Sequence, residues 1–292
     1  MKTFDIVFIG HMAIDEVRHF SGEVSVGAGS AVLCGALAAA RVGRRVAVIT
    51  RMAPADDHLV EPLREAGVDV MIIRAPVTTY MQVIHTSADV DIRRIIRKDS
   101  AGFFQPMDVP ELQTGVLHLA GISDQEFNLD FIRDLKSRGL KLSADMQSFV
   151  RQGDPVSGEI VFSDVAAKRE IVSLLDFVKL DIVEAEILTG TRDLEQAARQ
   201  IASWGAGEVV ITRSDGVLSL VDGVAYFSQF NNQSVIGRTG RGDTTFGAYL
   251  AWRPGHTIQD ALDFAAALVS IKMESIGPFK GTLEDVLKRL KS

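Results

Sequence analysis

The sequence predicts an α/β fold: a mostly parallel central sheet with helices on both faces, plus a small β lid. Two observations support this prediction. Strand-like apolar runs alternate with helix-like runs along almost the whole chain of 292 residues, which is typical of parallel strands connected by crossover helices. Neither an internal repeat nor a proline-rich linker interrupts the chain. We therefore expect a single domain over residues 1–292, with lid strands near residues 14–22 and 78–98.

The strands of the main sheet are expected where short apolar runs end in glycine or polar residues. The first run, residues 4–9, is followed by Gly10 and, five residues later, by Asp15. Because ligands of such sheets bind at the carboxyl ends of the strands, Asp15 is a candidate ligand-binding residue. Further strands are expected at 45–50, 68–73, 116–120, 140–144, 177–180 and 208–212. Helices are expected at 31–41, 57–66, 125–137, 183–188, 194–204 and 258–274.

Two β-rich runs do not fit this alternation. Residues 79–86 and 90–98 flank a short turn and predict a hairpin outside the main sheet, joined by residues near 16–20. Such a sheet can cover a ligand as a lid, although an ordinary edge hairpin is the alternative. The arginines of this hairpin, Arg93, Arg94 and Arg97, either contact a phosphorylated substrate or belong to a solvated edge strand.

The composition excludes several classes of function. Hydrophobic residues make up 47% of the chain, which is ample for a large core, and the net charge of -7 argues against nucleic acid as the main partner. Cys34 is the only cysteine, so the chain has neither an intrachain disulfide nor a thiolate metal cluster. No signal-like segment and no run of 18 uncharged apolar residues is visible, so we expect a cytoplasmic protein without a membrane partner.

The most informative stretch is residues 237–248, where three glycines lead into an apolar, helix-like run. We expect this helix to begin at about Asp243. The first N–H groups and the dipole of a helix converge at such a junction, which suits an anion. A carboxylate at the same point can accept a proton from an alcohol, and the two features together are what phosphoryl transfer to a hydroxyl needs. A surface turn with Asp243 as a plain helix cap is the alternative.

Residues 239–247 resemble the second signature of the ribokinase-like (PfkB-type) carbohydrate kinase family, which reads Asp-Thr-x-Gly-Ala-Gly-Asp. The resemblance covers nearly the whole chain, because further segments match in the right order. These segments are residues 10–15, 27–30, 55–56 with 65–68, 179–184 and 212–216. Two other segments, 143–147 and 272–279, resemble members grouped with inositol or unusual sugar kinases.

The resemblance implies a kinase that transfers the γ-phosphate of ATP, with Mg2+, to a hydroxyl of a sugar, polyol or nucleoside. Asp243 would accept the proton of that hydroxyl. A homodimer formed through the lid is a further option. The implied anion hole is Gly240, Arg241 and Gly242. The implied substrate-binding residues are Asp15, Gly27 and Gly29. Thr212 and Gly216 would border the nucleotide, and Asp181 and Glu184 would hold the magnesium, chiefly through water.

Several positions depart from the family pattern. Gly237 stands where the family has an acidic residue, Arg241 replaces an alanine, and Asp181 replaces an asparagine. Many members are activated by a monovalent cation beside the anion-hole loop, held partly by that acidic residue. The missing carboxylate and the added charges of Arg238 and Arg241 predict an enzyme that is indifferent to potassium. For potassium, the alternative is that both arginines point into solvent and backbone carbonyls alone hold the ion. For the kinase function, the alternative is a catalytically reduced regulatory protein that binds a sugar or a nucleotide on the same fold.

Overall fold

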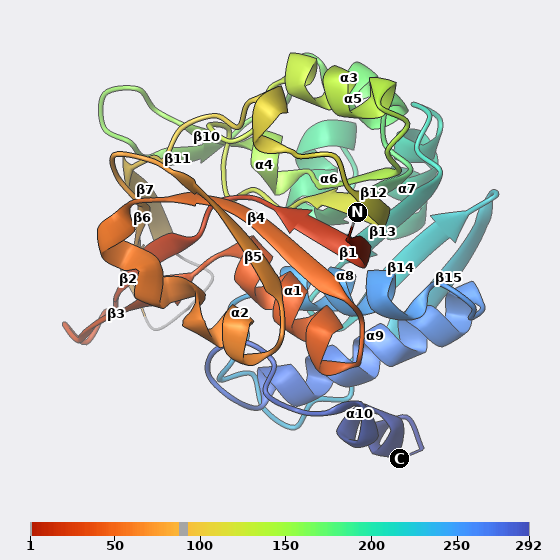
Figure 1. Cartoon of the computed structure of the whole chain (residues 1–292). Helices are drawn as coiled ribbons and strands as arrows, with labels where there is room; N and C mark the ends of the chain where they lie inside the picture. Colours follow the sequence, from red (N-terminus) through yellow and green to blue (C-terminus); the bar gives the residue numbers. More distant parts are fainter. Residues whose placement is uncertain (1, 88–92, 292) are drawn as a thin grey trace.

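A twisted, mostly parallel sheet forms the centre of the molecule (Figure 1). The computed structural model describes residues 2–87 and 93–291. Within these residues the main sheet has nine strands in the order β15-β14-β13-β12-β9-β8-β1-β4-β5. The strands from β13 to β5 are parallel, whereas β14 and β15 are antiparallel. Their bounds are β1 (Thr3–Ile9), β4 (Val46–Met52), β5 (Asp69–Arg74), β8 (Gln113–Leu119), β9 (Leu142–Asp145), β12 (Phe177–Asp181), β13 (Glu208–Thr212), β14 (Gly216–Val221) and β15 (Val224–Gln229).

Helices cover both faces of this sheet, which confirms the predicted fold class. Successive side chains of a strand point to opposite faces; in β1, Ile6 and Phe8 pack into one core layer, and Val7 and Ile9 into the other. The first layer includes α1 (Ala31–Arg41), α2 (Glu61–Glu65), α8 (Arg241–Trp252), α9 (Ile258–Met273) and α10 (Leu283–Arg289). The second includes α3 (Leu129–Ser137), α4 (Gln147–Val150), α5 (Lys168–Ser173), α6 (Ile182–Thr189) and α7 (Leu194–Ala202). No helix in the described part of the chain is long and apolar enough to span a membrane.

A second sheet lies beside the first, on the left in Figure 1. It has the order β3-β2-β6-β7, with β3 (Val24–Gly29), β2 (Ala13–Arg18), β6 (Thr79–His85) and β7 (Arg93–Asp99). Only β2 and β6 are parallel within it. The expected strand over 14–22 ends at Arg18, and β3 was not expected as a strand. The turn expected near residues 87–89 falls partly outside the described residues, as do residues 90–92 of the expected strand.

The outer strand of this second sheet is tied to the main body of the molecule. The buried Arg97 donates hydrogen bonds to Ser123 Oγ (2.8 Å) and Asp124 Oδ1 (2.6 Å). Arg94 forms a two-fold ion pair with Glu159, at 2.7 and 3.0 Å. A short hairpin of β10 (Arg151–Gly153) and β11 (Ile160–Phe162) flanks this contact. Arg94 and Arg97 therefore join the second sheet to the main body. Arg97 is buried and does not belong to a solvated edge, and a contact of these arginines with a phosphorylated substrate stays a prediction.

Candidate active site

The glycine loop feeds directly into α8, as the sequence suggested, but the helix begins earlier than expected. Gly240 is the N-cap residue, with φ 77° in the left-handed region, and α8 begins at Arg241. Asp243 is thus the third residue of the helix and not its cap, because glycine supplies the backbone conformation that the turn requires. The Arg241 N–H bonds to the Arg238 carbonyl at 3.0 Å. The N–H groups of Gly242 and Asp243 are then the first-turn donors that remain for an anion.

Asp243 and Asp15 come together at this point from opposite ends of the chain. Asp243 Oδ1 accepts a hydrogen bond from Gln147 Nε2 (3.3 Å), which also donates to the Gly121 carbonyl (2.9 Å). The pKa of Asp15 is raised to about 6, chiefly by burial and then by the charge of Asp243, against the opposing charge of Arg151. Two carboxyl groups that influence each other in this way can share the hydroxyls of one small ligand.

The two glycines expected to bind substrate differ in their surroundings. Gly29 ends β3 with its Cα directly beside the carboxyl group of Asp15, so that a side chain there would collide with that group. Gly27, in contrast, lies in open space, where an added Cβ would meet no atom within 4 Å. The absence of a side chain at Gly29 is therefore what allows Asp15 to lie against the loop. A substrate contact of Gly27 stays a prediction.

A buried ion pair lies beneath the anion-hole loop. Lys179 Nζ contacts Asp145 Oδ2 at 2.7 Å, and both side chains are at most 3% exposed. Burial alone would lower the pKa of Lys179, but the charge of Asp145, followed by those of other carboxylates, holds that pKa above its usual value. A Cβ added to Gly242 would lie only 2.8 Å from this ammonium group. Lys179 therefore places a permanent positive charge against the first turn of α8.

Sequence reasoning did not identify Lys179 or Asp145 as site residues. Lys179 is one of the residues quoted for the 179–184 motif, yet only the carboxylates of that motif were assigned a role. A lysine inside an otherwise apolar strand was the available signal, since a buried lysine needs a partner. Asp145 lies directly opposite Lys179 in the parallel register of β9 and β12.

Asp181 and Glu184, the proposed magnesium residues, form a capping box at the start of α6. Asp181 Oδ1 accepts the N–H groups of Val183 and Glu184, and Glu184 Oε2 accepts the N–H of Asp181, each at 2.8 Å. Glu184 is fully buried, and Arg151 Nη2 lies 3.4 Å from its Oε1. Burial, reinforced by the charge of Asp181, raises the pKa of Glu184 to about 8.

This donor set fits a hydrated magnesium ion better than a directly bound one. The cap uses Oδ1 of Asp181, which leaves Oδ2 on a partly exposed side chain. Glu184 is already engaged by an N–H group and a guanidinium group. Magnesium keeps much of its water shell in such sites, so one carboxylate suffices. Among the described residues, no three or more His, Cys, Asp or Glu side chains converge as a ready metal centre.

The two residues expected to border a nucleotide lie at the turn between β13 and β14. Thr212 is buried at the end of β13 and donates to the Leu180 carbonyl at 3.4 Å. Gly216 begins β14, where a Cβ would collide with the ring of Phe227 and lie 2.6 Å from the Ser228 carbonyl oxygen, so packing alone requires a glycine there. Between them, hydrogen bonds from Arg213 lower the pKa of Asp215, and Arg241 contributes to this shift. The Arg241 charge is therefore felt at this turn.

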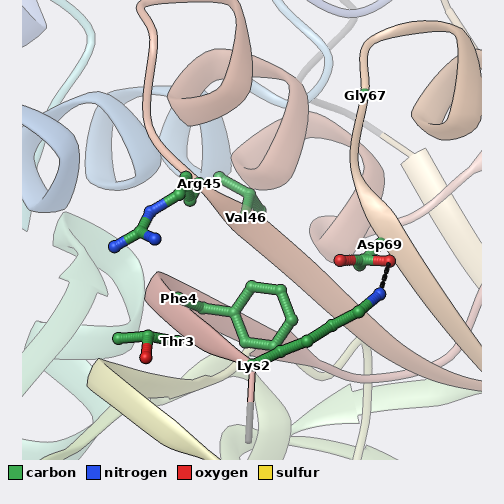
Figure 2. A pocket seen from close by; sticks show the side chains of 7 residues that line it. All are labelled: Lys2, Thr3, Phe4, Arg45, Val46, Gly67 and Asp69. Carbon is green, nitrogen blue, oxygen red and sulfur yellow. Dashed lines mark hydrogen bonds and ion pairs between the residues drawn. The ribbon is translucent and has the colours of Figure 1, made fainter.

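A separate surface pocket of about 300 Å³ lies far from these residues (Figure 2). Its lining comes from the beginnings of β1, β4 and β5, and the ion pair between Lys2 and Asp69 (2.9 Å) borders it. Parallel sheets bind their ligands at the carboxyl ends of the strands, and this pocket lies at the amino ends. The chemical groups described above, and not this pocket, are therefore the candidate active site.

Comparison with known proteins agrees with this architecture. Residues 4–284 match the model of the pfkB family carbohydrate kinases. A cytidine kinase of Thermococcus kodakarensis is 29% identical over 260 residues, which cover 85% of this chain and 87% of that protein.

Solved structures give the same picture. A pyrophosphate-dependent kinase in the ribokinase family, as its sulfate complex, superposes with a TM-score of 0.89 at 34% identity, covering 97% of this chain and 99% of that one. A pyrophosphate-dependent kinase of the same family, complexed with a pyrophosphate analogue and myo-inositol, gives 0.87 at 33% identity over the same shares. The ribokinase of Arabidopsis thaliana shares the fold, with a TM-score of 0.77 at 18% identity over the full length of both chains. The chain therefore belongs to the pfkB family of carbohydrate kinases.

Proposed function

We propose that this kinase transfers a phosphoryl group from pyrophosphate to a hydroxyl of a small polyol such as a cyclitol. The observation that carries the proposal is the convergence of Asp15 and Asp243 at the first turn of α8. One carboxylate can orient an alcohol while the other takes its proton, directly beside N–H groups that suit a phosphate. The similarity to a pyrophosphate-dependent kinase complexed with myo-inositol supports this choice of donor and acceptor.

In the proposed reaction, Asp15 accepts hydrogen bonds from hydroxyls of the polyol under the lid. Asp243, oriented by Gln147, accepts the proton of the reacting hydroxyl. The polyol oxygen forms a new bond to one phosphorus atom as the bridging P–O bond of pyrophosphate breaks, and inorganic phosphate leaves. Gly242 and the α8 N-terminus stabilise the charge on the transferred group. Magnesium near Asp181, when bound, would neutralise charge on the donor.

Fixed positive charges on the donor side support an inorganic donor. Lys179 is held ionised by Asp145 directly under Gly242. Arg151 lies 3.4 Å from Glu184, and the charges of Glu184 and Asp181 help to keep its pKa raised. Arg241 opens α8 on the side of the β13–β14 turn. Such charges recognise phosphate oxygens without any need for a base or a ribose. ATP, the donor implied by the sequence resemblance, is the competing candidate.

A donor and acceptor screen tests the proposal. Pyrophosphate and ATP are each offered with myo-inositol, ribose and cytidine, and products are followed by phosphorus NMR. We expect the highest kcat/KM with pyrophosphate and myo-inositol. Turnover with ATP but not with pyrophosphate would show that ATP, the donor implied by the sequence resemblance, is the correct one. Binding without turnover for every pair would favour the regulatory alternative.

The role of Asp243 is tested by Asp243→Asn. This change should lower kcat at least about a hundredfold, because it removes the proton acceptor. Asp260→Asn is a matched control, since Asp260 is also the third residue of its helix, α9, but is exposed. Both variants should fold and bind pyrophosphate. Near-normal turnover by folded Asp243→Asn would remove Asp243 from the mechanism.

The lid-mediated homodimer and the cytoplasmic location stay predictions.

A further inference from the structure

A buried lysine at the end of α9 contacts the anion-hole loop from behind. Lys272 is the penultimate residue of this helix and is only 1% exposed. Its ammonium group donates hydrogen bonds to the main-chain carbonyls of Gly237 and Thr239. Lysines are almost never fully buried unless their charge is compensated. The contact therefore needs an explanation beyond packing.

Lys272 differs from the other buried lysine of the site in what surrounds it. Lys179 is paired directly with the carboxylate of Asp145, whereas Lys272 Nζ donates to carbonyl oxygens. Burial lowers the pKa of Lys272, while the charge of Asp243 acts in the opposite direction. An ammonium group held by backbone carbonyls resembles a monovalent cation in a cage of such oxygens.

The geometry of the peptide unit gives this contact a consequence for the donor site. In a planar trans peptide, the carbonyl and the N–H of the same unit point in opposite directions. When Lys272 binds the carbonyls of Gly237 and Thr239, it turns the N–H groups of Arg238 and Gly240 away from itself. Gly240 is the N-cap of α8. The ammonium group thereby fixes the orientation of the backbone that leads into the anion hole.

The same loop is confined on its other sides. A Cβ on Gly237 would collide with the Ser275 carbonyl, and a Cβ on Gly240 would approach Cys34 Sγ to 2.5 Å. The Gly237 N–H also bonds to the Met273 carbonyl at 2.9 Å. The loop thus fits between the end of α9 and helix α1, and Lys272 supplies the charge at this junction. Without that charge, the carbonyl groups of Gly237 and Thr239 would lose the donor that they share.

We propose that Lys272 is a positioning residue whose ammonium group serves as a built-in monovalent cation for residues 237–240, the segment that leads into the anion hole. The inference rests on the proposed function, because that function assigns the loop to the phosphate donor. It also gives the expected indifference to potassium a different physical basis. The sequence argument relied on repulsion by Arg238 and Arg241, whereas the ammonium of Lys272 already occupies the carbonyl oxygens of the loop.

The first test replaces the charge but keeps an unbranched side chain. Lys272→Met should weaken binding of methylenediphosphonate, an inert pyrophosphate analogue, at least tenfold by calorimetry. Binding of myo-inositol should change less than twofold. Lys288→Met serves as the control, because Lys288 is an exposed lysine paired with Glu284 and should bind both ligands like the wild type. Wild-type affinity of Lys272→Met for the analogue would overturn the proposal.

The second test asks whether an added cation replaces the missing one. In Lys272→Ala, ethylammonium should restore analogue binding several-fold, whereas tetramethylammonium at matched ionic strength, which cannot donate hydrogen bonds, should not. Equal effects of the two cations, or none, would mean that Lys272 acts by packing alone. If Lys272→Ala does not fold, the same comparison is made on Lys272→Gln. These readouts need no turnover. A wild-type protein that binds the analogue but transfers no phosphoryl group would refute the proposed function, whereas wild-type analogue affinity in Lys272→Met would refute the role of Lys272.

Discussion

The raised pKa of Asp15 leads to a quantitative prediction for the pH dependence of catalysis. Its usual value of 3.8 rises to about 6, first through burial and then through the charge of Asp243. Asp15 is therefore about nine-tenths ionised at pH 7 and about one-tenth ionised at pH 5. The carboxylate accepts hydrogen bonds on both oxygens, whereas the protonated group carries a proton on one of them and accepts more weakly. We expect kcat/KM for myo-inositol to fall about tenfold between pH 7 and pH 5.

The assay measures kcat/KM for myo-inositol from pH 5 to pH 8 at saturating pyrophosphate. In Asp15→Asn, activity should be low and the fall of kcat/KM toward acid pH, the acid limb of the profile, should be absent. In Asp243→Asn, calorimetry of myo-inositol binding should show the limb at a lower pH, because the charge of Asp243 no longer opposes ionisation. A wild-type midpoint near pH 4 would refute the argument. If the acid limb persists in Asp15→Asn, another group is responsible for it. Asp145 is one candidate, because burial also raises its pKa to about 6 against the opposing charge of Lys179.

The same shift has a consequence for stability. A carboxyl group whose pKa is higher in the folded state contributes stability that is complete below its unfolded pKa of 3.8 and lost as the pH rises through about 6. At pH 7 the ionised Asp15 therefore destabilises the substrate-free protein. Asp15→Asn should raise the melting temperature at pH 7 while it impairs catalysis, and a lower melting temperature would contradict this sign.

Two further predictions concern the positive charges around the loop. Lys179→Met leaves Asp145 buried without a counter-charge, so urea denaturation should show a loss of about 3–5 kcal/mol, part of which Asp145→Asn in the same chain should restore. A loss below about 1 kcal/mol would mean that water reaches Asp145. Arg241→Ala should slow turnover, and rates in potassium, sodium and choline chloride at matched ionic strength should agree within about twofold. Strong activation by potassium, with Arg241→Ala harmless, would contradict both this prediction and the role of Lys272.

The sequence predicted the parallel part of the sheet well, because most of its strands are buried apolar runs that alternate with helical ones. It missed β14 and β15, whose connection does contain a recognisable signal. The turn is Asp222-Gly223, both residues have positive φ (49° and 77°), and Asp-Gly favours a tight hairpin. β3 could not be found in this way, since most of its residues are exposed and two are glycines. Its strand conformation depends on pairing with β2.

Only those site residues that belong to short sequence motifs could be predicted from the sequence. The glycine loop and Asp243 can be predicted from the local sequence, and the position of Asp15 follows from the rule that ligands bind at strand carboxyl ends. Lys272 and Asp145 could not be found, because their roles depend on contacts across the fold. Lys272 meets a loop 33 to 35 residues earlier in the chain, and Asp145 meets Lys179 through strand register.

The attachment of Arg97 to Ser123 and Asp124 fixes one edge of the second sheet, and this bears on where a ligand can enter. The edge of the second sheet formed by β7 is tied down by this buried contact and by the Arg94–Glu159 pair. At the opposite edge, Val24 and Val26 of β3 are exposed. With the β7 edge fixed, any movement of the second sheet is largest near the β3 edge. We therefore expect the polyol to enter, and its phosphorylated product to leave, beneath β3 and the turn that precedes it.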